Sequence, residues 1–393
     1  MCRIVYIVTH PVTVRVFLTG QLLDLRERGF HVTVISAPGK ELEPVNRLSG
    51  IQCVPVPLER EISPWHDIVS LWKLYWILRK LRPSIVNAGT PKAGLLGTVA
   101  AWLNGVPVRM YLVHGLRLET ASGLKRRVLW VAERVASACA TRIACVSESL
   151  RQVYLQNGLA AAEKTVVLAH GSCQGVDTRR FAAGKESLLA AAELGGRLGL
   201  PRETPVIGFV GRLTRDKGVV ELSRMYQSVL ERLPACRLLV VGDFEPGDRV
   251  PQPCVEYLKG HPQVIVTGFV DNPELYYHLM QVLVLPTHRE GFGNVLLEAA
   301  VAEVPTVAFR TTGTVDAVED GVTGSLVSLG DVPALTEAVM RYMENSELRR
   351  SHGRAGHDRV LRCFRSELVW DAVYNEYLRL LGQNIASTCK TDA

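Results

Sequence analysis

The feature of this sequence that most constrains its fold is an alternation of short apolar runs with segments of helical spacing. In the first half of the chain, the apolar runs fall at residues 4–8, 32–35, 85–87, 110–113 and 143–146. Each run is short enough for one strand and apolar enough to be buried on both faces. Strands of this kind, separated by helices, predict a parallel, doubly wound α/β sheet.

The same alternation begins again near residue 205, with apolar runs at 206–210, 238–241, 264–266, 282–285 and 306–309. The stretch 182–204 is rich in Ala, Gly and Leu and indicates a helix followed by a linker. A chain of 393 residues is too long for one ordinary hydrophobic core. We therefore predict two Rossmann-like domains facing each other across a cleft, over residues 1–182 and 205–363. A C-terminal packing helix and tail would occupy 364–393.

The composition is that of a folded globular protein, with 47% hydrophobic and 21% charged residues. No apolar run reaches the ~18 residues of a transmembrane helix, and residues 1–10 fit a first strand better than a signal peptide. The nine cysteines are scattered singly, without the spacing of a zinc site or a Cys-x-x-Cys pair. These features predict a cytoplasmic protein with reduced thiols.

The net charge of +6 is unevenly distributed along the chain. Residues 1–170 carry 21 Lys and Arg against 11 Asp and Glu, a net charge of +10, whereas the remainder carries 24 against 28, a net charge of −4. A basic N-terminal half suits a phosphate-bearing partner or an anionic membrane surface. An ordinary solvated surface is the alternative that charge alone leaves open.

Residues 287–300, THREGFGNVLLEAA, follow the apolar run 282–285 and continue into a helical pattern. A strand, a turn with glycines and a helix together offer backbone N–H groups to an anion at the start of the helix. Glu290 and Glu298 are separated by seven residues and bracket that turn. The spacing favours functional carboxylates over solvated helix positions, and a nucleotide-sugar is a ligand that such a turn would hold from both ends.

A basic turn follows the apolar run 206–210. Gly211 and Arg212 begin this turn, and Lys217 comes five residues after the arginine. Arg binds two phosphate oxygens at once and Lys acts as a point charge, so the pair suits a diphosphate. A surface pair is the alternative, which the Glu-Gly-Phe-Gly-Asn turn in the same domain disfavours. Asp216 is predicted to be a solvated turn residue rather than a catalyst.

The segments GRLTRDKG and EGFGN, with the second glutamate that follows, and the later segment DGVTG at 320–324 resemble the retaining glycosyltransferases of family 4. Further matches are HG at 114–115, CVSE at 145–148 and GVDTRRF at 175–181, so the resemblance extends over most of the chain. It implies the GT-B fold of two facing Rossmann-like domains. The loop at 9–17 lacks the family's glycine-rich sequence, and this variant resembles the subgroup that builds surface polysaccharides and glycans on polyprenyl-diphosphate sugars.

The resemblance also implies roles for individual residues. Arg212 and Lys217 would hold the donor diphosphate and stabilise the departing negative charge. Glu290 would contact the donor sugar, and His114 would face that sugar from the first domain, with a satisfied core histidine as the alternative. The donor-binding residues implied by the family are Gly211, Gly291, Phe292, Gly293, Asn294, Val295 and Glu298, with Glu298 on the ribose hydroxyls.

The acceptor side is less strongly marked. The resemblance to the polyprenyl-diphosphate subgroup makes Arg15, Lys92 and Arg117 candidate contacts to the acceptor or its diphosphate.

Residues 65–82, WHDIVSLWKLYWILRKLR, are aromatic and basic at the spacing of a helix that lies in a membrane interface. The segment KRRVLW at 125–130 adds to this pattern. The alternative is a helix that packs on the sheet with basic residues at its rim. We expect peripheral contact with an anionic membrane, on the cytoplasmic face of the inner membrane.

Together these observations predict a retaining glycosyltransferase that moves an N-acetylhexosamine or hexose from a UDP-sugar to a polyprenyl-diphosphate-linked sugar. No cofactor and no nucleic-acid partner are expected, and no metal, because the sequence lacks an Asp-x-Asp pair. The alternatives are a UDP-sugar 2-epimerase of the same fold, a nicotinamide oxidoreductase and a non-catalytic membrane scaffold. The oxidoreductase is disfavoured because no G-x-G-x-x-G follows the first strand, and a scaffold would leave the donor residues unexplained.

Overall fold

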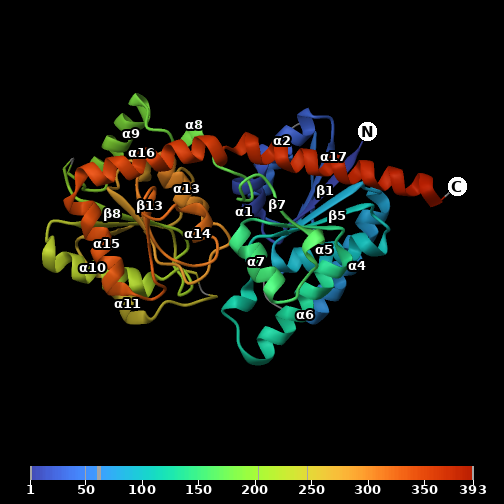
Figure 1. Cartoon of the computed structure of the whole chain (residues 1–393), viewed down its shortest axis with the longest axis horizontal. Helices are drawn as coiled ribbons and strands as arrows, with labels where there is room; N and C mark the ends of the chain where they lie inside the picture. The colour runs from blue at the N-terminus through green and yellow to red at the C-terminus, as the bar shows by residue number, and fades with distance from the viewer. Residues whose placement is uncertain (1, 49, 60–62, 202, 246, 392–393) are drawn as a thin grey trace. The chain divides into compact units, whose positions relative to one another are not determined.

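The computed structural model describes residues 2–48, 50–59, 63–201, 203–245 and 247–391, with side chains described up to residue 382. The chain forms two compact units (Figure 1). Unit 1 comprises Met1–Gly175 together with Ser366–Ala393, and unit 2 comprises Val176–Arg365. Each unit contains one parallel sheet flanked by helices, which confirms the predicted fold class of two Rossmann-like domains.

The boundaries of the units differ from the predicted ones at two places. Residues 176–204 belong to unit 2 rather than to a first domain and a linker. The Val176 N–H donates to the Phe364 carbonyl at 2.8 Å, which fixes the start of unit 2 to its end. The predicted separate packing helix is part of unit 1, because its inner face lies in the core of that unit.

The sheet of unit 1 has the strand order β3-β2-β1-β4-β5-β6-β7, and all its strand pairs are parallel. Its strands are β1 (Arg3–Ile7), β2 (His31–Ser36), β3 (Ile51–Pro55), β4 (Ile85–Gly89), β5 (Val108–Val113), β6 (Arg142–Cys145) and β7 (Thr165–Val167). Its longer helices are α2 (Thr19–Glu27), α3 (Leu42–Asn46), α4 (Pro64–Leu81), α5 (Pro91–Leu103), α6 (Gly123–Cys139), α7 (Glu148–Gln156) and α17 (Ser366–Thr391). Shorter turns are α1 (Pro11–Thr13), the π-helix η1 (Val14–Leu18), and the 3₁₀ turns η2 (Arg117–Glu119) and η3 (Ala162–Lys164).

Alternate residues of β1 enter two separate cores, as the pleat of a strand requires. Ile4 and Tyr6 face a cluster that includes α2 and α17, whereas Val5 and Ile7 face a cluster that includes α4 and α5. Both faces of the sheet are therefore buried, which explains why its central strands are continuous apolar runs.

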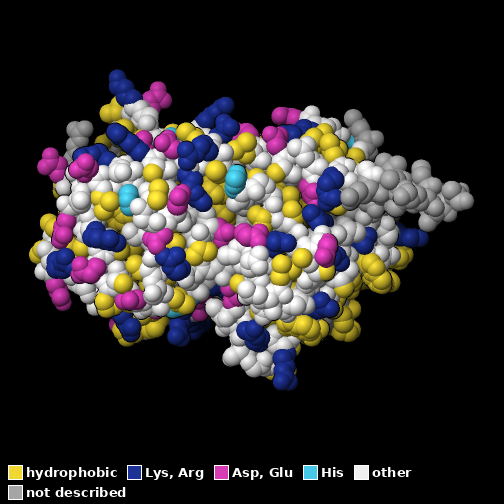
Figure 2. Space-filling view, viewed as in Figure 1, with side chains coloured by type: hydrophobic (Ala, Val, Ile, Leu, Met, Phe, Trp, Pro, Cys, Tyr) yellow, Lys and Arg dark blue, Asp and Glu magenta, His cyan; other side chains and the backbone are white. Residues whose placement is uncertain are grey.

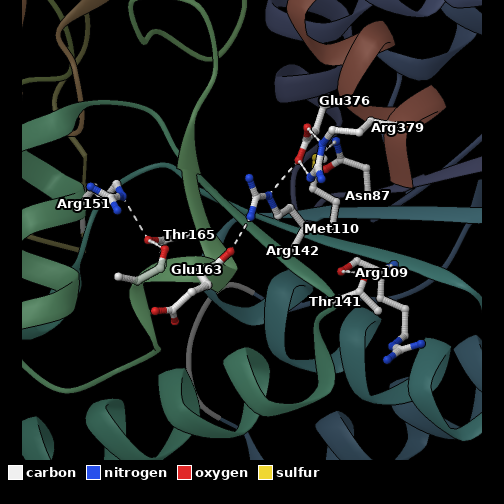
Figure 3. A network of polar contacts seen from close by, with 11 residues as sticks. Asn87, Arg109, Met110, Thr141, Arg142, Arg151, Glu163, Thr165, Glu376 and Arg379 are labelled. Carbon is white, nitrogen blue, oxygen red and sulfur yellow. Dashed lines mark hydrogen bonds and ion pairs between the residues drawn. The ribbon is translucent and has the colours of Figure 1, made fainter. Parts of the chain in front are cut away.

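Helix α17 is held to unit 1 by a polar network as well as by packing (Figure 3). Arg142 of β6 donates from Nε to Glu376 Oε1 at 2.7 Å, and Arg379 donates to both oxygens of the same carboxylate at 2.7 Å. Burial acts to raise the pKa of Glu376, but the hydrogen bonds and charges of the two arginines outweigh it and lower the pKa. Deeper in the unit, Asn87 donates to the buried hydroxyl of Tyr377 at 2.6 Å. The last helix in sequence thus completes the first domain.

The sheet of unit 2 has the strand order β10-β9-β8-β11-β12-β13, again parallel. Its strands are β8 (Val206–Val210), β9 (Arg237–Val241), β10 (Val264–Val266), β11 (Val282–Leu285), β12 (Thr306–Phe309) and β13 (Gly324–Val327). Its helices are α8 (Thr178–Phe181), α9 (Lys185–Arg197), α10 (Val219–Arg232), α11 (Gln252–Gly260), α12 (Glu274–Tyr277), α13 (Asn294–Val301), α14 (Thr314–Ala317), α15 (Val332–Glu344) and α16 (Ser346–Cys363).

Each predicted strand is present, and strands β3, β7 and β13 were not predicted. β3 is an edge strand, IQCVP, with only its first residue buried, so its pattern is too polar to stand out. β7 has three residues, and β13 reads Gly-Ser-Leu-Val. Across the part of the chain that the structure describes, no helix combines the length and the apolar character needed to cross a membrane.

Candidate functional site

The loop between β8 and α10 follows the carboxyl end of the first strand of unit 2. Its first residue, Gly211, has φ +150°, and its N–H donates to the Val241 carbonyl at 2.9 Å. The loop that follows β9 also packs closely against Gly211, because a Cβ atom at Gly242 would lie 1.8 Å from the Gly211 carbonyl oxygen. The loop that carries Arg212 and Lys217 is therefore fixed in place by backbone contacts that side chains would block.

The loop between β11 and α13 lies at the end of a neighbouring strand, because β8 and β11 are paired. It ends at Gly293, which precedes α13 with φ +90°, a left-handed conformation that favours glycine. The helix begins at Asn294, and its start carries the partial positive charge of a helix N-terminus. This geometry is the strand–turn–helix that the sequence predicted.

The two loops touch each other. A Cβ atom at Gly218 would lie 1.7 Å from the Pro286 carbonyl oxygen, so the backbones approach as closely as glycine permits. Lys217 Nζ and Glu290 Oε2 form an ion pair, and the two side chains are only 14% and 18% exposed. The structure thus brings together two residues that are 73 positions apart and were predicted from separate motifs.

Arg212 belongs to the same loop but is more exposed, at 42% of its side chain. Its Nη1 donates to Glu245 Oε2 at 2.7 Å. Glu245 follows β9, at the same edge of the sheet, and was not among the predicted site residues. Its position after a strand was the available signal, because the carboxyl ends of parallel strands meet at one edge.

Glu298 lies one turn into α13 and is partly buried, so it is not a solvated helix position. Its Oε2 accepts a hydrogen bond from the hydroxyl of Tyr277 at 2.6 Å. Burial raises the pKa of Glu298, and the hydrogen bond from Tyr277 and the charge of Arg180 oppose that rise. Tyr277 was not predicted as a site residue, since nothing in the sequence distinguishes it from a core aromatic residue.

Asp216 is not the solvated turn residue that was predicted. Its side chain is 18% exposed and accepts hydrogen bonds from Thr214 Oγ1 at 2.6 Å and from Arg289 Nη2 at 2.9 Å. Burial acts to raise its pKa, but these two hydrogen bonds and the charges of Lys217 and Arg289 bring the pKa down to about 2. A sequence cannot reveal this role, because the arginine that pairs with Asp216 is 73 residues away.

The remaining predicted donor residues surround the start of α13. Gly291 is buried, and a Cβ atom at Gly313 would lie 2.5 Å from its carbonyl, so the chain is tightly packed here. The ring of Phe292 packs against Phe364 at a centroid distance of 5.3 Å and serves the core of unit 2. Val295 is partly buried in the first turn of the helix.

The predicted residues of unit 1 lie at the carboxyl edge of its own sheet. His114 follows β5 and is partly buried, and a Cβ atom at Gly89 would lie 2.9 Å from its Nε2 atom. Burial lowers the pKa of His114 to about 4, so the imidazole is neutral at physiological pH. Arg15 lies in η1, after β1, and Arg117 lies in η2, after β5.

Lys92 has a partner that the sequence did not predict. Its Nζ donates to Asp67 Oδ1 at 2.7 Å, and the two side chains are 10% and 21% exposed. Asp67 belongs to α4, so this ion pair joins α4 to the first turn of α5.

No three His, Cys, Asp or Glu side chains come together as a metal site within the residues that the structure describes. The side chains at the edge of the unit 2 sheet include Arg212, Lys217 and Glu290, next to the start of α13. Arg, Lys and a helix N-terminus can bind a phosphate group, and a carboxylate can accept hydrogen bonds from hydroxyl groups.

Two family profiles match the chain. The one described as "Glycosyl transferases group 1" matches residues 204–345, and the one described as "Glycosyl transferase 4-like domain" matches residues 13–171. Among curated proteins, the chain is 36% identical to the capsular polysaccharide biosynthesis glycosyltransferase CapM of Staphylococcus aureus over 366 residues, which cover 92% of this chain and 94% of the relative.

A second relative is the UDP-Gal:alpha-D-GlcNAc-diphosphoundecaprenol alpha-1,3-galactosyltransferase of Escherichia coli, 26% identical over 74% of each chain. Solved structures with the same fold include sucrose-phosphate synthase from Thermosynechococcus elongatus, with a TM-score of 0.81 at 20% identity over 98% of this chain and 100% of that one. HepE of Anabaena, in complex with UDP and glucose, has a TM-score of 0.77 at 19% identity over the full length of both chains.

Proposed function

Because the chain belongs to the group 1, or family 4, glycosyltransferases, we propose that it transfers a sugar from a UDP-sugar to a polyprenyl-diphosphate-linked sugar. The transfer would retain the anomeric configuration, move an N-acetylhexosamine or hexose, and serve the assembly of a surface polysaccharide or glycan. The relatives from S. aureus and E. coli, whose names concern capsular polysaccharide and a diphosphoundecaprenol acceptor, support this assignment. The observation that carries it is the pairing of Lys217 with Glu290 at the edge of the unit 2 sheet.

The donor would bind at that edge. Lys217 has three N–H donors, so it can hold Glu290 and still offer a hydrogen bond to a phosphate oxygen. Arg212 and the start of α13 would supply further positive charge to the diphosphate. Glu298, held by Tyr277, would accept hydrogen bonds from the ribose hydroxyls.

The chemical step would break the bond between the anomeric carbon and the diphosphate, with the electron pair leaving on UDP. The acceptor hydroxyl oxygen would bond to that carbon on the same face, and its proton would pass to a phosphate oxygen of the leaving UDP. The anomeric carbon becomes cation-like in the transition state. Glu290 would lie beside that carbon, while Lys217 and Arg212 would stabilise the leaving phosphate, which gains negative charge.

Unit 1 would bind the acceptor. Arg15, Lys92 and Arg117 lie after strands of its sheet and would contact the acceptor diphosphate or sugar. The polyprenyl chain would remain in a membrane, so unit 1 also needs a surface that meets lipid.

Helices α4, α5 and α6 lie side by side on unit 1 and carry such a surface, which we name the apolar face (Figure 1). Its members are the exposed large apolar residues Trp65, Ile68, Val69, Trp72, Trp76, Trp102, Leu103, Leu124, Val128, Val131 and Val135. Figure 2 shows hydrophobic side chains, in yellow, gathered at the lower right edge, where Figure 1 draws α4 and α6.

Packing on the sheet does not account for these side chains. Leu74 and Leu78 are the α4 members of the buried core cluster beneath this helix. Trp65, Trp72 and Trp76 are 75%, 62% and 53% exposed. Inserting one such tryptophan into lipid would contribute on the order of 2 kcal/mol.

Charge on the same helices favours an anionic lipid surface. Exposed basic residues on α4 and α6, and at the end of α4, are Lys73, Arg79, Lys80, Arg82, Lys125, Arg126, Arg127 and Arg134. The acidic residues of these helices are Asp67, paired with Lys92, and Glu133, whose side chain is buried. Each exposed base near such a surface contributes about 1 kcal/mol. We therefore propose that the protein is peripheral on the cytoplasmic face of the inner membrane.

The catalytic proposal is tested with the purified chain, a panel of UDP-sugars and a polyprenyl-diphosphate-linked sugar. We expect release of UDP and an extended lipid-linked product, with strong loss in Lys217→Ala and Glu298→Ala variants that remain folded. An absence of UDP binding by calorimetry, or conversion of the UDP-sugar to an epimer in the absence of any acceptor, would overturn the proposal.

The membrane proposal is tested by flotation with phosphatidylglycerol vesicles and with phosphatidylcholine vesicles. The wild type should float with the anionic lipid at low salt, and a Trp72→Ser and Trp76→Ser double variant should float far less. Leu188→Ser and Leu189→Ser, on exposed residues of α9 in unit 2, provide the matched control and should float like the wild type. Equal flotation of both double variants would show that the apolar face is not the docking surface.

A further inference from the structure

Three consecutive residues of the β11–α13 loop each meet a polar side chain from the segment before and within α10. His288 Nε2 lies 3.0 Å from Glu221 Oε1, Arg289 Nη2 lies 2.9 Å from Asp216 Oδ2, and Glu290 pairs with Lys217. We name the two central pairs, Asp216 with Arg289 and Lys217 with Glu290, the loop clasp. Neighbouring residues on each loop carry opposite charges, so the two pairs fix the register of one loop against the other.

Asp216 is the centre of this contact. Its backbone carbonyl accepts hydrogen bonds from the His288 N–H at 2.8 Å and from Thr287 Oγ1 at 3.1 Å, and its own N–H donates to Asp248 Oδ2 at 2.8 Å. Its carboxylate binds Thr214 and Arg289. The carboxylate, the N–H and the carbonyl of Asp216 thus all contact the loops at this edge of the sheet.

We propose that Asp216 and Arg289 are positioning residues that hold Lys217 and Glu290 in the geometry needed to bind the diphosphate and the sugar of the donor. This inference rests on the proposed function and gives a role to two residues for which the sequence predicted none. Lys217 and Glu290 have flexible side chains on loops, and a fixed loop register limits the positions that their charged ends can take. Catalytic groups perform best when supporting contacts hold them in place beforehand.

A purely electrostatic role for Asp216 predicts the opposite sign of effect. Its negative charge lies next to Lys217, at a site proposed to bind an anion, so removal of the charge would strengthen diphosphate binding if position did not matter. Asp216→Asn retains the shape of the side chain and removes the charge. The direction of the change in affinity therefore separates positioning from electrostatics.

The test compares the binding of UDP and of uridine to the full-length chain by calorimetry. Lys217 and Glu290 act on the diphosphate and the sugar, so a positioning role affects UDP and leaves uridine unaffected. We expect the Kd for UDP to rise about tenfold in Asp216→Asn and in Arg289→Met, and to rise no further in the double variant, because both changes break the same contact. The Kd for uridine should stay within about twofold of the wild-type value.

The matched control is Asp24→Asn in unit 1, because Asp24 is also 18% exposed and pairs with Arg28 at 2.9 Å. It should change neither affinity. An unchanged or stronger UDP affinity in Asp216→Asn would overturn the positioning role while leaving the proposed function intact. Failure of the wild type to bind UDP would instead refute the proposed function.

Amide hydrogen exchange provides a second measurement that needs no ligand. The amides of residues 287–291 should exchange faster in Asp216→Asn than in the wild type, and should be unchanged in Asp24→Asn. Equal exchange in all three proteins would show that Asp216 does not hold the loop, whatever the protein binds.

Discussion

Replacing Tyr277 by phenylalanine should weaken UDP binding without disturbing the core. The ring of Tyr277 is fully buried and packs against Phe181 at a centroid distance of 5.7 Å, and a phenylalanine ring keeps that contact. What is lost is the hydrogen bond of 2.6 Å from the Tyr277 hydroxyl to Glu298 Oε2. Glu298 is the residue proposed to hold the ribose, so its orientation would no longer be fixed.

The size of the effect follows from the kind of hydrogen bond. A bond to a charged group contributes about 1.5–3 kcal/mol net. Glu298 is partly exposed, so water can replace part of what the tyrosine supplied, and the lower end of that range applies. About 1.5 kcal/mol corresponds to roughly a tenfold rise in the Kd for UDP.

The effect should also depend on pH. Burial raises the pKa of Glu298, and the hydrogen bond from Tyr277 acts in the opposite direction, so its removal raises the pKa further. The protonated carboxylic acid accepts fewer hydrogen bonds from hydroxyl groups than the ionised carboxylate does. The loss of affinity in Tyr277→Phe should therefore be larger at an acidic pH than at an alkaline pH.

Calorimetric titration with UDP at these two pH values measures both effects. Tyr226→Phe is the matched control, because Tyr226 is equally buried in unit 2 and its hydroxyl donates to the carbonyl oxygens of Cys236 and Gln263. It should leave the Kd unchanged. A Kd in Tyr277→Phe within about twofold of the wild-type value at both pH values would refute the reasoning that Tyr277 orients Glu298 for binding.

Four further predictions concern stability, protonation and metal. Gly218→Ala should destabilise the protein by more than about 2 kcal/mol in urea unfolding, because its Cβ atom would overlap the Pro286 carbonyl, whereas Gly260→Ala, at the open end of α11, should be neutral or stabilising. Asp216→Asn should lower the free energy of unfolding by about 2 kcal/mol at neutral pH, because the folded pKa of Asp216, about 2, lies below the unfolded value of about 4. This difference should be lost as the pH falls from about 4 to about 2, because the wild-type carboxylate then becomes protonated. The transfer rate should show no ionisation of His114 between about pH 5 and about pH 8, because its pKa is about 4, and a step that His114→Asn abolishes would contradict this. EDTA should leave transfer unchanged, and a loss of activity restored by a divalent cation would refute the prediction that no metal takes part.

Most of the fold could be predicted from the sequence, because a strand buried on both faces needs a continuous apolar run whatever surrounds it. The runs at β1, β2, β8 and β11 are of this kind. Edge strand β3 is half exposed and carries no such signal. The membership of α17 in unit 1 was also hidden, since apolar spacing indicates that a helix packs but not on which domain.

Candidate donor residues were recognisable from glycines next to charged residues at strand ends. Lys217 and Glu290 belong to such motifs. Local geometry explains the glycines of these motifs, because Gly293 has a left-handed conformation and the backbone at Gly218 approaches Pro286 too closely for a side chain. Contacts across the two loops had no local signature.

By itself, the sequence determined the two parallel sheets and the position of charged and glycine-rich loops at their edges. Burial of a strand and the backbone conformation of a turn each leave a signal within a short stretch of sequence. Only the tertiary structure decided which charges meet. The pairing of Asp216 with Arg289 depends on β8 and β11 lying side by side, and that adjacency joins residues 73 positions apart. The outward direction of the tryptophans of α4 was decided in the same way, because Leu74 and Leu78 occupy the side of the helix that the sheet buries.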